Sequence, residues 1–110
     1  MRGGAATLYV LDADHGTKVG ITTQTIEQRV DDLRRGSGFE ARVVATFDFV
    51  NAVEARTVER IAHWLLRDDR THGEWFHTHP LVAADAVRRA CQGPTRLAYL
   101  RAGALGRLAG

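Results

Sequence analysis

The sequence has one cysteine, Cys91, and no uninterrupted apolar run near membrane-spanning length. A lone cysteine cannot form an internal disulfide framework, so the composition gives no indication of secretion. A membrane helix needs about 20 consecutive apolar residues, which this chain lacks. The apolar run near the N-terminus is very short and Asp12 follows it directly, which is not typical of a signal peptide. We therefore expect a cytoplasmic protein without a membrane-spanning segment.

The charge of the chain is nearly balanced. Its 15 Lys and Arg residues against 13 Asp and Glu give a net charge of +2, and nearly all of the positive charge is arginine. This balance, with a pI near 9.2, is compatible with a nucleic-acid partner but does not require one. With 110 residues, 45% of them hydrophobic, the chain has the size of one domain with a modest core.

The first half of the sequence predicts a hairpin, a helix and a third strand. Two short β-prone runs, Thr7–Leu11 and Lys18–Thr22, are separated by a turn-rich loop of about six residues. Ile26, Val30 and Leu33 follow at helical spacing, which predicts a helix that runs to Arg35 and ends at a Gly-Ser-Gly sequence. The next strand is expected at Glu40–Phe49.

The second half predicts mainly helices. Asn51 is a favourable N-cap for a helix with Glu54 at the third position, and its expected buried residues are Val53, Val58, Ile61, Trp64 and Leu65. A polar loop of sequence RDDRTHG follows, then a short β-like piece, EWFH. Pro80 then opens a last helix, at a position in the first turn that proline tolerates.

These elements predict an α+β fold: a small three-stranded antiparallel sheet flanked by helices, in the order β-β-α-β-α-(β)-α. We expect one domain over residues 1–92. The remaining tail, residues 93–110, has a weak helical pattern and is expected to be helical or partly disordered.

Several short motifs in this order resemble the GIY-YIG endonuclease superfamily. Tyr9 in LYV and Gly20 in KVG resemble its two hairpin motifs, and Arg29 stands nine residues after Gly20, where the superfamily has a helix arginine. Glu59 is in the position of its metal-binding glutamate. The sequences KVGIT, E-x3-H ending at His63, and EWF are similar to those of the T5orf172/Mug113-like branch. The resemblance covers about residues 8–90.

The resemblance implies a metal-dependent endonuclease that hydrolyses phosphodiester bonds of DNA. Tyr9 would orient or deprotonate the attacking water, and Arg29 would bind the phosphate with its planar, permanently charged fork. Glu59 would bind Mg²⁺ or Mn²⁺. Lys18 replaces the second tyrosine of the superfamily, as in the nearest branch, and would contact phosphate or act as a base. His63, one turn after Glu59, would support the metal ligand or bind the metal weakly.

Other interpretations fit the same residues. Tyr9 is equally explained as a sheet aromatic, and Glu59 as a solvated carboxylate on the outer side of its helix. The chain could then be a catalytically inactive module that keeps the fold and binds nucleic acid or a protein. A third possibility is a small zinc protein, whose candidate ligands are His72, His77, His79 and Cys91, although structural zinc sites usually have tighter spacings and more cysteines.

Overall fold

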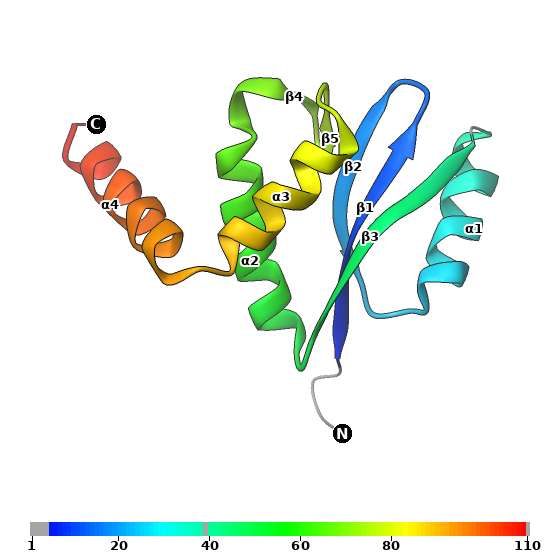
Figure 1. Ribbon diagram of the computed structural model, residues 1–110, viewed down its shortest axis with the longest axis horizontal. Helices are drawn as coiled ribbons and strands as arrows, with labels where there is room; N and C mark the ends of the chain where they lie inside the picture. The colour runs from blue at the N-terminus through cyan, green and yellow to red at the C-terminus, as the bar shows by residue number, and fades with distance from the viewer. Residues whose placement is uncertain (1–4, 39, 110) are drawn as a thin grey trace.

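The computed structural model of the protein describes residues 5–38 and 40–109, so residues 1–4 of the expected domain and residue 110 of the expected tail lie outside it. It is an α+β fold with one antiparallel sheet in the strand order β3-β1-β2-β5-β4 (Figure 1). The strands are β1 (Ala6–Ala13), β2 (Gly16–Thr22), β3 (Ala41–Phe49), β4 (Arg70–His72) and β5 (Trp75–Phe76). The helices are α1 (Ile26–Ser37), α2 (Ala52–Leu65), α3 (Pro80–Ala90) and α4 (Gly93–Ala109), with a 3₁₀ turn, η1 (Arg67–Asp69), after α2.

The α+β class is confirmed, but the sheet has five strands rather than the three predicted, and the β-like piece in EWFH is one of them, β5. The polar RDDRTHG segment forms η1 and β4, and β4 pairs with β5. In turn, β5 adds to the edge of β2 through two residue pairs, Thr17 with Phe76 and Lys18 with Trp75. The β1–β2 hairpin is also longer than predicted, because the pairing continues to Ala13 and Gly16. Its connecting loop therefore has two residues rather than six.

Helices cover both faces of the sheet. Alternate residues of β1 point to opposite faces, as the two-residue period of a strand requires. Leu8 and Val10 belong to the larger core, which α2 and α3 complete, whereas Tyr9 and Leu11 pack with Val30 of α1. In Figure 1, α1 therefore lies on one side of the strands and the α2–α3 pair on the other. Tyr9 reaches the α1 face because it follows Leu8 by one residue.

The ends of α1 and the start of α2 follow local rules. The side chain of Thr25 caps α1 by accepting from the backbone N–H of Gln28, and Gly38 ends the helix with φ at 72°, a conformation that favours glycine. Asn51 caps α2 by accepting from the N–H of Glu54 at 2.8 Å, which confirms the predicted cap. These caps fix where both helices begin relative to β2 and β3.

The buried face of α2 differs from the prediction. Val58 and Ile61 are buried, but Val53 is 77% exposed. Its other buried residues are Ala55, Glu59 and Ala62. Small alanines allow α2 to approach the sheet closely, so the carboxylate of Glu59 turns inward. The solvated alternative for Glu59 was therefore wrong.

Helix α4 forms the region beyond the predicted domain and lies on the far side of α2 and α3 from the sheet (Figure 1). Tyr99 packs edge-on against Trp64 of α2, with 5.6 Å between ring centroids, and Arg96 pairs with Glu54 at 3.2 Å. Over residues 5–38 and 40–109, the structure contains no helix that is long and apolar enough to cross a membrane.

Candidate active site

The centre of the candidate site is the cross-strand pair of Tyr9 and Gly20. Tyr9 is fully buried, and its partner in β2 has no side chain. A Cβ atom at Gly20 would lie 2.7 Å from the Tyr9 hydroxyl and 2.6 Å from Oε1 of Glu74. Real Cβ atoms essentially never come so close to other atoms. Gly20 therefore provides the space in which a phenol from β1 and a carboxylate from the β4–β5 turn come close together.

Arg29 approaches this centre from α1. Its Nε donates a hydrogen bond of 3.2 Å to the hydroxyl of Tyr9. The side chain is half-buried, so its stem covers the edge of the apolar stripe while the guanidinium reaches over the sheet. The structure thus brings together two of the residues that the sequence singled out, although they are 20 positions apart.

Lys18 is held by a carboxylate. Its Nζ lies 3.0 Å from Oε1 of Glu74 and 5.3 Å from the ring centroid of Trp75. Its side chain is only 10% exposed. The backbone adds a further link, because the N–H of Val19 donates to the carbonyl of Glu74 at 3.0 Å. Lys18 and Val19 therefore fix the position of Glu74 at the edge of β2.

Glu59 is a buried carboxylate on α2. Its pKa is raised to about 7, mainly by burial and then by the negative charge of Glu74 and a hydrogen bond with Glu74, while the positive charges of Arg56 and Lys18 act against this increase. Oε2 of Glu59 is buried, and no residue within the described part of the chain gives it a hydrogen bond. A buried carboxylate oxygen without a partner is costly, which makes Glu59 a candidate ligand for a cation.

His63 lies one turn further along α2. Its Nε2 is 2.9 Å from the carbonyl of Val19 and 3.9 Å from Oε2 of Glu59. Burial lowers the pKa of His63, and its ring packs against Phe76 at 5.0 Å between centroids. A carbonyl only accepts hydrogen bonds, so Nε2 carries the hydrogen and the other ring nitrogen is unprotonated. His63 thus joins α2 to β2 through this hydrogen bond, which leaves Nε2 unable to bind a metal.

The protonation state of Tyr9 limits the roles that its hydroxyl can have in the site. Burial raises its pKa above the ordinary value, and the opposing hydrogen bond and charge of Arg29 do not cancel this effect. The phenol is therefore neutral near pH 7. It can orient a water or a phosphate oxygen through its hydroxyl, but it does not match a residue that removes a proton from water.

The donor set fits a hard divalent cation. Glu59 and Glu74 supply two carboxylates from different elements, and Oε2 of Glu59 has no partner in the described chain. Mg²⁺ typically takes one or two protein carboxylates and keeps several waters. Sequence reasoning named the EWF motif but gave Glu74 no role, because its closeness to Glu59 depends on the β4–β5 hairpin.

The zinc alternative has no support in the described residues. Within residues 5–38 and 40–109, no three His, Cys, Asp or Glu side chains are grouped so that they could hold a metal ion. His79 instead caps α3, where its Nδ1 accepts from the N–H of Leu81 at 3.1 Å, and Cys91 ends the same helix.

Fold and site together define an α+β domain in which an arginine–tyrosine pair lies beside two carboxylates at the edge of a hairpin. The T5orf172 domain matches residues 6–91, which is most of the chain. This protein therefore belongs to the T5orf172 domain family. No curated protein and no solved structure gives a significant match.

Proposed function

We propose that this protein is a metal-dependent endonuclease of the GIY-YIG type, which hydrolyses phosphodiester bonds of DNA. The main support is the buried Glu59 carboxylate, whose Oε2 has no hydrogen-bond partner among the described residues and which lies beside Glu74. A phosphodiesterase needs a cation near the reacting phosphate, and a second positive group to bind a phosphate oxygen. The family match is consistent with the proposal.

In this proposal each residue has one task. Arg29 binds a non-bridging phosphate oxygen, while its Nε stays on the Tyr9 hydroxyl. Tyr9 accepts that hydrogen bond, and its own hydrogen remains available to orient the attacking water or a phosphate oxygen. The water oxygen forms the new bond to phosphorus as the bond to the leaving oxygen breaks. The attacking water releases one proton to solvent, and the leaving oxygen takes one up from solvent.

The carboxylates would hold the metal. Glu59 and Glu74 would bind Mg²⁺ or Mn²⁺, and the bound cation would stabilise the negative charge that develops on the leaving oxygen. Lys18 keeps Glu74 in place through their 3.0 Å ion pair. His63 keeps α2 against β2 by donating to Val19. Lys18 and His63 are thus positioning residues, one for each carboxylate.

A nicking assay on supercoiled plasmid with Mg²⁺ or Mn²⁺ tests the proposal. The wild type should nick the plasmid, and Glu59→Gln or Arg29→Ala should lose at least about 100-fold in rate. Glu27→Gln and Arg60→Ala change exposed residues of α1 and α2, and they should nick like the wild type. DNA binding without any cleavage would instead identify an inactive binding module.

Metal binding has a readout that does not depend on cleavage. Mg²⁺ or Mn²⁺ at about 100 times its Kd should stabilise the wild type by about 2.7 kcal/mol in thermal unfolding. This stabilisation should be lost in Glu59→Gln and Glu74→Gln but kept in Glu27→Gln. Equal stabilisation of all four proteins would contradict the assignment of the two carboxylates.

A further inference from the structure

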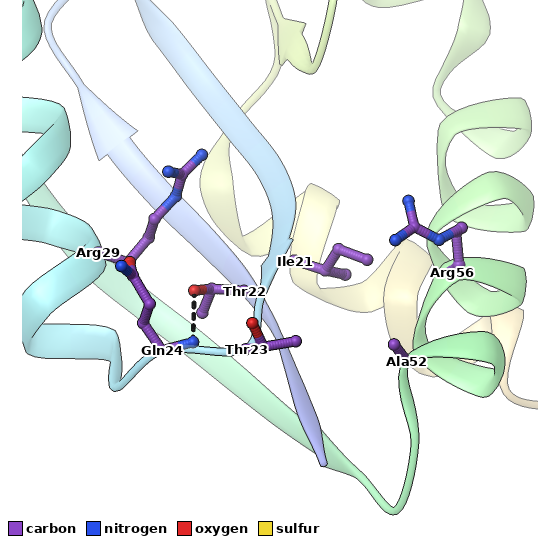
Figure 2. Close-up of a pocket in the computed structure, with 7 residues that line it drawn as sticks. All are labelled: Ile21, Thr22, Thr23, Gln24, Arg29, Ala52 and Arg56. Carbon is purple, nitrogen blue, oxygen red and sulfur yellow. Dashed lines mark hydrogen bonds between the residues drawn. The ribbon is translucent and has the colours of Figure 1, made fainter. Parts of the chain in front are cut away.

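A polar pocket opens beside Arg29, next to the candidate active site. It has a volume of about 360 Å³ and lies where β2 ends, between α1 and α2 (Figure 2). The residues that line it are Ile21, Thr22, Thr23, Gln24, Arg29, Ala52 and Arg56. Arg29 belongs both to this pocket and to the Tyr9 hydrogen bond, so the pocket and the active site share a wall.

Two guanidinium groups give the pocket its charge. Arg29 projects from α1 and Arg56 projects from α2, and Figure 2 shows them on opposite sides of the end of β2. None of the lining residues is acidic. In the part of the chain that the structure describes, Arg56 makes neither an ion pair nor a hydrogen bond. The charge of Arg56 acts on Glu59, whose pKa it lowers, but its hydrogen-bond donors remain available to a ligand.

Neutral hydrogen-bond donors complete the pocket. Oγ1 of Thr22 accepts a hydrogen bond of 3.0 Å from the N–H of Gln24. The hydrogen of the Thr22 hydroxyl is not used in this bond, so it can donate to a ligand. Thr23, which directly follows β2, is exposed and also carries a hydroxyl. Guanidinium groups and hydroxyls together are the usual partners of phosphate oxygens.

We propose that this pocket binds a second phosphate of the DNA strand, the phosphodiester next to the one that is cleaved. This inference rests on the proposed function, since it takes the scissile phosphate to lie between Arg29 and the two carboxylates. Arg56 stands three residues before Glu59, so it lies on the same side of α2, one turn closer to the start of the helix. A strand that passes from the carboxylates along α2 therefore meets Arg56 next, and Arg29 borders both phosphates.

The test compares Arg56→Ala with Arg60→Ala, an exposed arginine four residues later on the same helix. Binding of a fluorescent DNA duplex of about 20 base pairs is measured by anisotropy in EDTA, from about 50 to 200 mM salt. Arg56→Ala should weaken binding about five- to tenfold and reduce the slope of log K against log salt by about one. Arg60→Ala should keep the affinity and slope of the wild type.

The outcomes separate this inference from the proposed function. If Arg56→Ala and Arg60→Ala have the same affinity and slope while the wild type nicks plasmid, the pocket assignment is overturned and the endonuclease stands. If Arg56→Ala alone loses a phosphate contact but the wild type never nicks, the pocket stands only as a phosphate site of a DNA-binding module and the endonuclease proposal fails. A wild type that does not bind the duplex overturns the pocket.

Discussion

The hydroxyl of Tyr9 accepts a hydrogen bond of 3.2 Å from Nε of Arg29, which joins the centre of the sheet to α1. Tyr9 is fully buried, whereas Arg29 is half-buried and borders an open pocket. The pair therefore links a rigid element of the core to a charged group that a ligand can reach.

A double-mutant cycle should detect the Tyr9–Arg29 bond. Tyr9→Phe removes the acceptor and Arg29→Ala the donor, so the two changes should be coupled by about 0.5–1.5 kcal/mol in the free energy of unfolding. Urea denaturation of the two single variants and the double variant gives this coupling. Arg34→Ala, on the same helix but bonded to the carbonyl of Ala41, should show no coupling with Tyr9→Phe.

Gly20→Ala should damage both stability and activity. The new Cβ would lie 2.7 Å from the hydroxyl and 2.9 Å from Cζ of Tyr9, a buried ring that cannot move away easily. We expect a loss of about 1–3 kcal/mol, the usual cost of overpacking, and loss of nicking. Gly36→Ala is the matched control: nothing lies within 4 Å of its Cβ position in α1, so it should be neutral or stabilising. A Gly20→Ala protein as stable as the wild type would show that Tyr9 is not confined by β2.

Glu59 should make the metal-free protein less stable as pH rises. Its pKa is about 7 in the folded protein and 4.5 ordinarily, so the folded state favours the protonated form. This contribution to stability is complete below pH 4.5 and is lost as pH rises through about 7. Glu59→Gln stays neutral, so its melting temperature in EDTA should exceed that of the wild type at pH 8 but not at pH 4.5. Glu27→Gln should show no such pH-dependent gain.

His63 should make the protein less stable as pH falls, which is the opposite of the effect of Glu59. Burial lowers its pKa below the ordinary 6.5, so the folded state favours the neutral ring. Its contribution to stability is complete above pH 6.5 and is lost as pH falls through the lowered pKa. His63→Gln keeps a donor for the carbonyl of Val19 and cannot gain a proton, so this acid-induced loss should shrink. Unfolding measured from pH 7.5 to about 5, with the exposed His72→Gln as control, checks this.

Local rules predicted much of the fold. The spacing of Ile26, Val30 and Leu33, the cap at Asn51 and the position of Pro80 each act over a few residues, and the structure contains the corresponding helices. The pairing of β5 with Lys18 depends on a contact between residues 57 positions apart. No pattern within one segment reveals such a contact, which is why the prediction had only three strands.

The candidate site was predictable only in part. Motif order singled out Tyr9, Arg29 and Glu59, but hydrophobic periodicity gave only part of the inner face of α2 correctly, with Val58 and Ile61 buried as predicted. It placed Val53 inside, although Val53 is 77% exposed, and it gave no weight to Ala55 and Ala62, which are buried. Small side chains carry little hydrophobic signal, so close approach of a helix is hard to infer from sequence alone.

One of the two carboxylates directly precedes the shortest strand of the sheet. Glu74 precedes β5, which has two residues and is attached to β2 by two residue pairs and the Val19–Glu74 backbone bond. Detachment of this small hairpin would remove an acid from the site while α1, α2 and the three long strands stayed folded. Deuterium uptake at the amide of Val19 would report such an opening, so the first event in inactivation need not be the melting of the protein.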